Sequence, residues 1–469
     1  MFDFFKMIKK YSPTKEEISE ILKTSPEALE AFERAYAVGS LSDGYDEFPT
    51  NAKEAAEMNA GVPQSGFPQI EDIMRRIVSE LMGNSVALVY DGKNMYVREG
   101  LKDADLNPVS KEEIESLPIH QRPQFTGRLT QIDINEPSSH MLLDHYHLYK
   151  TEKDPKKGKI HYHLFRQGLD ILDIDPVLYE MLGMNQNAIG YWLPYMVKAA
   201  QGGFFKIPAT TIIKVPITLL QLTRLDYGRL NRTTLDIVDD YCRQIFDLDL
   251  EKEYFIKNGV FSSKFDFRNA RVSGAKEVRE LGEYLLFIHN QATMMAGPLT
   301  SPSIYGAATT NEWAVREFIK DKEGNPCIYH GLPLHTEYRL FVDFDTKKVI
   351  GMTPYWDPAT MKKRFGEGAD QKDPDMYHDY VIYSAHEEIL MDRYNKSKNL
   401  VKAQMESLIQ KVDGLTGQWS VDVMQNGDDF WLIDMAWAQN SAFYSVVPEH
   451  LRIPMTEDWI PKLPEKVNK

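Results

Sequence analysis

Apolar residues recur along this chain with two different spacings, and the two kinds of segment alternate. Apolar residues three and four positions apart predict helices at residues 12–40 (a pair), 69–82, 110–116, 176–182, 192–200, 233–246 and 400–412. Short apolar or alternating runs predict strands at residues 85–90, 95–98, 207–216, 254–257, 313–319, 335–343 and 349–352. Asp91 and Gly92, between the first two strands, are typical of a hairpin turn. The mixture predicts an α+β fold.

Composition narrows the class of protein. The chain has 469 residues, of which 43% are hydrophobic, and this length suggests about two to four domains with sizeable cores. A formal net charge of −15 argues against binding nucleic acid through bulk electrostatics. Cys242 and Cys327 are too few for a disulfide framework, which favours the cytoplasm. No secretory signal and no apolar run of about 18 residues is present, so we expect no membrane association.

Two carboxylates stand on apolar, strand-like runs near the C-terminal end. Asp422 and Asp434 flank the hairpin-type turn at residues 425–429, so an antiparallel hairpin can bring them together on one face. Two carboxylates held close together repel each other unless a cation lies between them. Oxygen-only ligands of this kind suit Mg²⁺ shared with substrate phosphates. The alternative is a pair of strand-edge acids that face water.

A second group of residues has the chemistry of a phosphate site. Lys257 ends a short apolar strand, and a loop of small residues with Ser262, Ser263 and Lys264 follows. Ammonium groups and backbone N–H groups in such a loop can neutralise phosphate oxygens. The sequence is not a Walker A motif, and a solvated turn with two surface lysines is the alternative.

A third group lies on the strand at residues 335–343. Glu337, Arg339 and Phe341 share one face of this strand, because strand side chains alternate. An arginine at this place is suited to bidentate contact with phosphate. The alternative is a cross-strand salt bridge from Arg339 to Glu337 or to Asp343.

In this order, the motifs resemble the ATP-grasp superfamily and, within it, the branch of the D123 cell-division-cycle proteins, over roughly residues 195–445. The resemblance implies an ATP-grasp fold, in which two α+β lobes clasp ATP, preceded by an N-terminal helical and β-hairpin extension. The implied domains are the extension at 1–125, a substrate-side lobe at 126–250, the nucleotide-binding lobes at 251–455 and a tail at 456–469.

The resemblance also implies roles for individual residues. Nucleotide phosphates would contact Lys257, the loop residues Ser262, Ser263 and Lys264, and Arg339. The adenine edge would meet the backbone at Glu317, Phe318 and Ile319, and Asp422 and Asp434 would bind Mg²⁺. Lys214 is a candidate for a second nucleotide-contacting lysine, for which Lys206 competes. The family's asparagine after the second carboxylate is replaced by Ala436, so Asn440, Gln439 or water would supply that metal ligand.

The implied activity is that of an ATP- and Mg²⁺-dependent, ADP-forming ligase in the cytoplasm. It would join a carboxylate substrate, including a protein or peptide, to an amine or similar nucleophile through an acylphosphate. Lys264 and Arg339 would stabilise the transferring phosphoryl group. Two alternatives remain open: a D123-like, ATP-binding assembly factor for a partner protein, and a kinase.

Two further motifs have competing interpretations. Residues 411–414 match the KxDG nucleophile motif of nucleotidyltransferases, but Lys411 follows a helical pattern and Gly414 reads as a helix stop. In the second motif, a predicted hairpin would place four imidazoles on one face, as a metal site or more simply as a polar stripe, namely those of His145, His147, His161 and His163.

Overall fold

The fold is known from a computed structural model of the 469-residue chain. It describes residues 68–83, 85–101, 107–124, 148, 151–158, 160–161, 182–183, 185–223, 230–264, 270–296, 310–366 and 374–454. The predicted helices at 12–40 and the tail after residue 454 lie outside the described residues. Within the described residues, no helix is both long and apolar enough to cross a membrane.

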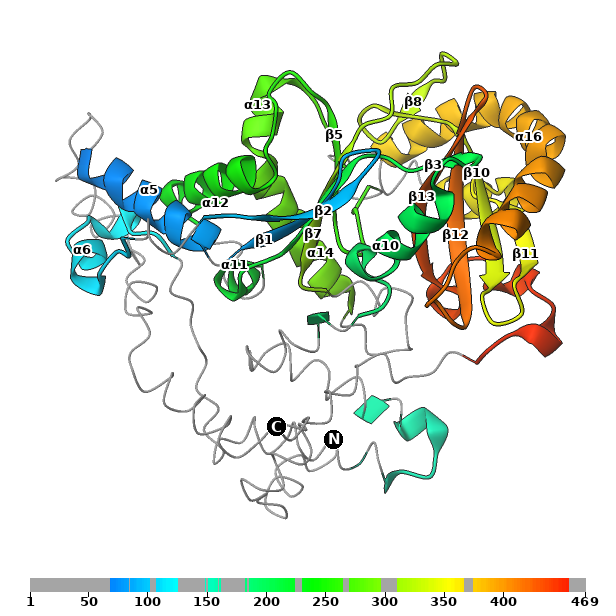
Figure 1. The fold of residues 1–469 in the computed structure, drawn as a ribbon, viewed down its shortest axis with the longest axis horizontal. Helices are drawn as coiled ribbons and strands as arrows, with labels where there is room; N and C mark the ends of the chain where they lie inside the picture. Colours follow the sequence, from blue (N-terminus) through cyan, green and yellow to red (C-terminus); the bar gives the residue numbers. More distant parts are fainter. Residues whose placement is uncertain are drawn as a thin grey trace.

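The described part of the molecule is built around two large sheets, and the first of them has six strands (Figure 1). Its order is β2 (Met95–Glu99), β1 (Val86–Tyr90), β4 (Thr210–Lys214), β7 (Glu312–Glu317), β5 (Tyr254–Asn258) and β6 (Arg271–Val272), and every neighbouring pair is antiparallel. The helices α5 (Pro68–Gly83), α12 (Arg232–Ile245) and α14 (Leu281–Ala296) pack together beside it. Apolar residues of these helices and of one sheet face form a continuous core.

A five-stranded sheet forms the second half (Figure 1). Its order is β11 (Lys348–Pro354), β10 (Thr336–Asp343), β12 (Gln418–Asn426), β13 (Asp429–Trp437) and β3 (Phe205–Lys206), and only β3 is parallel to its neighbour. The long helix α16 (Pro374–Ile409) packs on β10 and β11, while α10 (Ile189–Ala200) contacts both β13 and β7. A second core joins these helices to one face of the sheet.

Shorter elements complete the described chain. They are α6 (Lys111–Glu115), η3 (Ile119–Gln121), α11 (Ile217–Leu222), α13 (Gly274–Arg279), β8 (Cys327–Ile328), β9 (Leu332–Pro333), α15 (Pro358–Met361), the π-helical turn η6 (Lys362–Gly366), η8 (Ala438–Asn440), η9 (Tyr444–Val446) and η10 (Glu449–Leu451). Helix α6 begins with a capping box, in which Ser110 and Glu113 bond each other's backbone.

Most predicted elements in the described part are confirmed, and the fold is α+β. The hairpin β1–β2 from the predicted N-terminal extension is part of the six-stranded sheet, since β1 pairs with β4. The strand predicted at residues 207–216 is shorter, and the helix predicted at 400–412 is the last third of α16. His161 is helical, so the prediction of a strand there was wrong, while His145, His147 and His163 lie outside the described residues.

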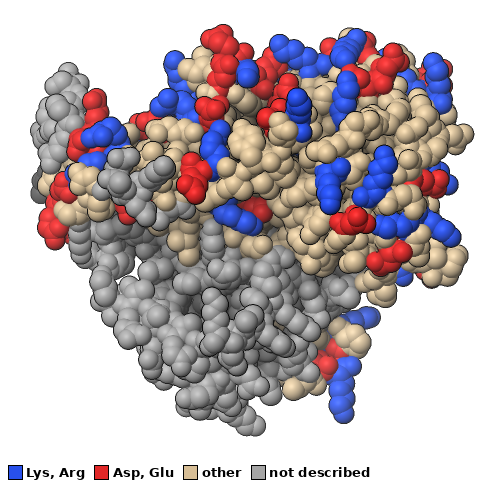
Figure 2. Space-filling view, viewed as in Figure 1, with Lys and Arg blue, Asp and Glu red and all other residues tan. Residues whose placement is uncertain are grey.

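Charged side chains on the visible surface do not form a field of one sign. Figure 2 shows Lys and Arg interspersed with Asp and Glu over the described part of this face. Such a mixed surface gives little long-range attraction for a polyanion.

Candidate functional site

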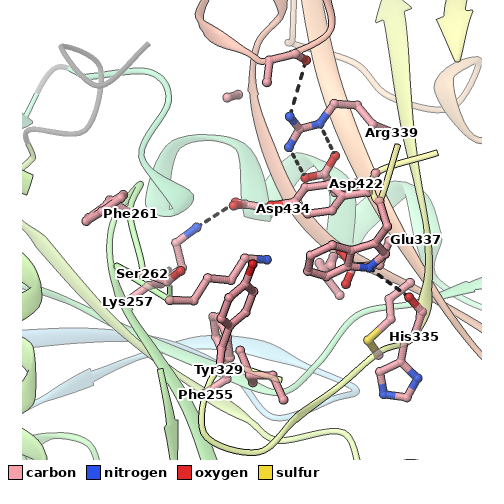
Figure 3. A pocket seen from close by; sticks show the side chains of 18 of the residues that line it. Phe255, Lys257, Phe261, Ser262, Tyr329, His335, Glu337, Arg339, Asp422 and Asp434 are labelled. Carbon is pink, nitrogen blue, oxygen red and sulfur yellow. Dashed lines mark hydrogen bonds and ion pairs between the residues drawn. The ribbon is translucent and has the colours of Figure 1, made fainter. Parts of the chain in front are cut away.

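A cavity of about 380 Å³ lies where the two sheets face each other. Its walls come from β5 and the loop after it, from the end of β7, from β10, β12 and β13, and from the segments that follow β11 and β13. Many of the predicted site residues line it, namely Lys257, Ser262, Ser263, Lys264, Glu317, Phe318, Ile319, Arg339, Asp422, Asp434 and Asn440. Residues from segments far apart in the sequence therefore meet in one place (Figure 3).

Strand alternation explains the wall that the six-stranded sheet contributes. Phe255 and Lys257 on β5 face the cavity, while Ile256 between them belongs to the core on the other face. On β7, Arg316 lies directly opposite Phe255 in the ladder and also lines the cavity. This wall therefore presents cations to the cavity.

The wall from the five-stranded sheet presents a row of charges across three adjacent strands. Arg339 on β10 lies opposite Asp422 on β12, and Asp422 lies opposite Asp434 on β13. Leu340 and Val421, one position away on their strands, point to the core instead. Neighbouring strands lie about 5 Å apart, so the three side chains form one compact group.

A β-bulge places the second carboxylate in this row. Val423 pairs with Leu432, but the next pair is Asp422 with Asp434, so Ile433 is an extra residue. Without the bulge, Ile433 would lie opposite Asp422 and Asp434 would point to the other face. The carbonyl of Ile433 also accepts a hydrogen bond from Nη1 of Arg316, which ties the bulge to the opposite sheet.

One ion pair crosses the cavity between the two sheets. Nζ of Lys257 donates to Oδ1 of Asp434 at 2.8 Å, as Figure 3 shows. The Lys257 side chain is 2% exposed and that of Asp434 is 39% exposed. Burial lowers the pKa of Lys257, and Asp434 opposes this change.

The other ion pair lies within the five-stranded sheet. Arg339 contacts Asp422 through two hydrogen bonds, Nε to Oδ1 at 2.8 Å and Nη2 to Oδ2 at 2.6 Å. Although burial alone would lower the pKa of Arg339, the carboxylate of Asp422 raises it overall. The predicted alternatives, a salt bridge with Glu337 or Asp343, were therefore wrong about the partner.

The loop after β5 has an unusual backbone conformation and an unsatisfied hydroxyl at one residue. Ser263 has a positive φ of 53°, which is uncommon for a residue with a side chain. Its hydroxyl is buried and has no hydrogen-bond partner among the described residues. Strained backbone and unsatisfied buried polar atoms both concentrate at binding sites.

Glu337 adds a third carboxylate to the wall of the five-stranded sheet. It is 7% exposed, and its Oε2 is buried without a hydrogen-bond partner among the described residues. Burial raises the pKa of Glu337 to about 7, and the charge of Lys264 opposes this rise. Sequence reasoning named Glu337 only as a salt-bridge partner, because burial at a cavity wall is not visible in the sequence.

The predicted adenine-contacting segment lies at another edge of the cavity. Glu317 ends β7, and Phe318 and Ile319 follow it. The N–H groups of Glu317 and Phe318 already donate to the carbonyls of Ala209 and Glu253, so within the described part the Ile319 N–H is the unpaired donor of the three.

The structure does not bring every predicted residue to the cavity. Lys214 and Lys206 lie outside its lining; Lys214 pairs with Glu312 at 2.6 Å, and Lys206 pairs with Asp429 at 2.7 Å. Lys411 follows the end of α16 with Gly414 at φ +95°, as the helix-stop interpretation predicted.

Sequence reasoning missed two kinds of lining residue. Arg316 is 3% exposed, and its Nη2 has no hydrogen-bond partner among the described residues. Burial lowers the pKa of Arg316 to about 10, which leaves it charged at neutral pH. Tyr355 and Trp356, which follow β11, were also not predicted; the only sequence signal for them is their position just after a strand.

The donor set fits a hard divalent cation. Asp422 and Asp434 offer carboxylate oxygens side by side, and among the described residues Oδ2 of Asp434 has no bonded partner. Asn440 also lines the cavity, although its Oδ1 already accepts a contact from Asn187 at 3.4 Å. Ala436 lines the cavity and offers no oxygen from its side chain.

A second acidic group lies near the cavity, where Asp321, Glu323 and His335 have ligand atoms within 4.8 Å of one another. Asp321 already accepts hydrogen bonds from Asn325, and Nη1 of Arg393 lies 3.5 Å from Glu323. Arg393 on α16 thus supplies positive charge to this acidic group. The same guanidinium donates to Asn325, so these contacts hold residues 321–325 against α16.

The chain has only distant similarity to known proteins in the comparisons made. No protein-family model matches the chain, and no curated protein matches it in sequence. Among solved structures, the chain is similar to C-terminally truncated Cdc123 from Schizosaccharomyces pombe, with 15% identity, 55% of this chain and 85% of that chain covered, and a TM-score of 0.30. For Cdc123 from the same organism the values are 14%, 54%, 83% and 0.29. These scores are too low to assign a function, so a functional assignment has to rest on the cavity and its residues.

Proposed function

We propose that this protein binds ATP with Mg²⁺ in the cavity between its two sheets and uses it in an ADP-forming ligation. The observation that carries the proposal is the row Arg339, Asp422 and Asp434 on one wall, facing Lys257 and Arg316 on the other. Cations on both sides of paired carboxylates suit a metal–triphosphate complex, whose phosphates need positive partners and whose metal needs carboxylates.

The charge balance of the cavity supports an anionic ligand. Four cations line it, namely Lys257, Lys264, Arg316 and Arg339. Three carboxylates lie among them, Glu337, Asp422 and Asp434, while Glu317 is exposed at the rim. Positive charge therefore exceeds negative charge, and a Mg–ATP complex carries the opposite sign.

Each charged residue has a role in this proposal. Asp422 and Asp434 would hold Mg²⁺, which when bound supplies electrostatic stabilisation of the β- and γ-phosphate oxygens. Lys257 and Arg339 would turn from these carboxylates toward phosphate oxygens, and Lys264 and Ser263 would cover the phosphates from the loop. The Ile319 N–H would meet the adenine edge. The reaction requires no nucleophile from the protein.

An ATP-dependent assembly factor for a partner protein is the second candidate. Ala436 favours it, because the residue two positions after Asp434 offers no side-chain oxygen to a metal. A ligase releases ADP at a rate that depends on its acceptor, whereas an assembly factor binds ATP without such turnover. A kinase differs from a ligase in leaving a phosphorylated product.

Isothermal titration of ATP with Mg²⁺ tests the shared part of these proposals. We expect the wild type to bind, and Asp434→Asn and Lys257→Ala each to weaken binding by ~1–3 kcal/mol, since each removes a charged contact. Lys214→Ala is the matched control, because it changes a paired lysine outside the cavity. Absence of binding by the wild type, or binding by both cavity variants as tight as that of the wild type, would reject the nucleotide site.

A further inference from the structure

The loop lysine Lys264 does not point into open cavity; its ammonium lies against the opposite sheet. Its Nζ is 4.7 Å from the centre of the Tyr355 ring and 5.5 Å from that of Trp356. Both distances are within the range of cation–π attraction. Burial alone would lower the pKa of Lys264, but Tyr355 and Glu337 raise it overall, so the surroundings favour the charged ammonium.

Three side chains make up these surroundings, and we call them the ammonium cage: Glu337, Tyr355 and Trp356. The two rings stand nearly perpendicular, at 77° with centres 5.1 Å apart. Glu337 contributes a carboxylate whose Oε2 has no hydrogen-bond partner among the described residues. Aromatic faces combined with a carboxylate attract cations and repel phosphates.

Hydrogen bonds that do not involve Lys264 hold the ammonium cage in place. The backbone N–H of Tyr355 donates to the carbonyl of Glu337 at 2.9 Å. The indole of Trp356 donates to the carbonyl of His335 at 3.1 Å, and its own carbonyl accepts from Tyr383 on α16 at 3.0 Å. These bonds fix the cage to β10 and to α16, whereas Lys264 belongs to the loop of the other sheet. The cage therefore persists if Lys264 moves.

We propose that the ammonium cage is a binding site for the primary ammonium group of a second ligand, and that Lys264 occupies it until a nucleotide draws that lysine to its phosphates. The inference deepens the proposed function, because it assigns particular residues to the binding of an amine beside the phosphates. It rests on the proposed function only for the nucleotide that displaces Lys264.

The cage lies beside the residues proposed to hold the phosphates and the metal. Arg339 also lies over the Tyr355 ring, with its Cζ 4.8 Å from the ring centre, and it binds Asp422 on its other side. The cage is thus one residue away from the carboxylates proposed to hold Mg²⁺. The charge of Lys264 acts on Glu337, and the ligand's ammonium would take over this influence once Lys264 has moved.

A substitution that removes Lys264 from the ammonium cage tests, without any nucleotide, whether the cage binds an ammonium group. Lys264→Ala removes the resident ammonium, and we expect it to bind n-butylammonium at least tenfold more tightly than the nucleotide-free wild type. Butan-1-ol, which is similar in size but neutral, should not compete. Thermal unfolding checks that the variant is folded, and Lys264→Ser is the second variant with an empty cage.

A second substitution shows whether the cage is responsible. Adding Glu337→Gln to Lys264→Ala should weaken n-butylammonium binding at least tenfold. Adding Trp431→Leu should leave the affinity for n-butylammonium unchanged. Trp431 makes a comparable cation–π contact outside the cavity, with Nζ of Lys206 at 5.6 Å from its ring centre. Equal binding by Lys264→Ala and wild type, or no effect of Glu337→Gln, would overturn the ammonium site.

Repeating the measurement with bound nucleotide tests this inference separately from the proposed function. With saturating Mg²⁺ and a non-hydrolysable ATP analogue, the wild type should bind n-butylammonium as tightly as Lys264→Ala does. If the analogue binds and n-butylammonium affinity does not rise, the displacement of Lys264 is wrong. If the analogue does not bind, the proposed function fails, while the result with Lys264→Ala still decides whether the cage accepts an ammonium.

Discussion

Two ion pairs meet in the cavity, and the fold holds them in different ways. Arg339 and Asp422 lie opposite each other on neighbouring strands of one sheet, so strand pairing fixes their distance. Lys257 and Asp434 come from different sheets, so their distance depends on how closely the sheets approach. The Arg339–Asp422 pair is therefore fixed by the sheet, whereas the Lys257–Asp434 distance changes if the two sheets move apart.

The two ion pairs also differ in the solvent exposure of their carboxylates. Asp422 is almost completely buried, but Asp434 keeps more than a third of its side chain accessible. A ligand can reach the Lys257–Asp434 pair without breaking the ladder. We expect an incoming metal–nucleotide complex to separate this pair first and the Arg339–Asp422 pair afterwards.

The largest effect is expected from breaking the pair within the sheet. Asp422→Asn leaves the Arg339 guanidinium in a buried place without a counter-charge, which costs roughly 3–5 kcal/mol. Chemical denaturation of both proteins measures the loss as a lower free energy of unfolding. Asp413→Asn, which changes an exposed aspartate, is the control and should be nearly neutral. A loss below about 1 kcal/mol for Asp422→Asn would show that strand pairing does not confine this pair.

Glu337 sharpens the comparison, because it lies in the same sheet wall without a cation bonded to it. Its pKa in the folded protein, about 7, is above the ordinary value of 4.5, so the folded state disfavours the ionised form. Wild-type stability should therefore be highest below pH 4.5 with respect to this group and fall as pH rises through 7, by about 3 kcal/mol.

Glu337→Gln isolates this effect, because the amide cannot ionise. The difference in unfolding free energy between Glu337→Gln and wild type should grow between about pH 5 and pH 7.5 and then level off. A difference that does not change with pH would show that Glu337 ionises in the fold as it does in water.

A smaller effect is expected from breaking the pair between sheets. Asp434→Asn leaves the buried Lys257 ammonium without its carboxylate, but Asp434 is 39% exposed, so solvent already screens the pair and we expect a loss of ~1–2 kcal/mol. The same variant should bind Mg–ATP more weakly, as titration would measure. If it lost as much stability as Asp422→Asn, the two pairs would not differ in the way their exposure indicates.

The smallest effect is expected at Lys214, which was predicted as a site residue. Its side chain is half exposed and pairs with Glu312 away from the cavity. Lys214→Ala should leave nucleotide affinity unchanged, because Lys214 lies outside the cavity lining. A clear loss of Mg–ATP affinity would return Lys214 to the site.

The sequence allowed the strands of the site to be predicted, because apolar alternation and turn residues mark them locally. It also allowed Asp422 and Asp434 to be paired, but for an incomplete reason. A regular two-residue hairpin would place Ile433 opposite Asp422, and the bulge that corrects this has no signal in the residues themselves. Register at this level depends on tertiary contacts such as that of Arg316 with the Ile433 carbonyl.

Residues that act through burial were harder to predict. Arg316, Tyr355 and Glu337 are ordinary residues of strands and strand ends in the sequence, and they matter because two sheets close over them. Lys214 shows the reverse case: the sequence made it a candidate site residue, but it lies outside the cavity lining and pairs with Glu312 on the next strand. Which charges find partners is decided between segments that are far apart in the chain.

The interleaving of the two sheets has a consequence for synthesis on the ribosome. The chain enters the five-stranded sheet at β3, crosses to the six-stranded sheet at β4, and returns only after β7. β1 can pair with β4 only after more than a hundred further residues have been synthesised, and β3 can pair only once β13 has been made. Neither sheet can close while the nascent chain is short, so unpaired strand edges remain exposed for most of translation. Such a topology favours slow folding and dependence on chaperones.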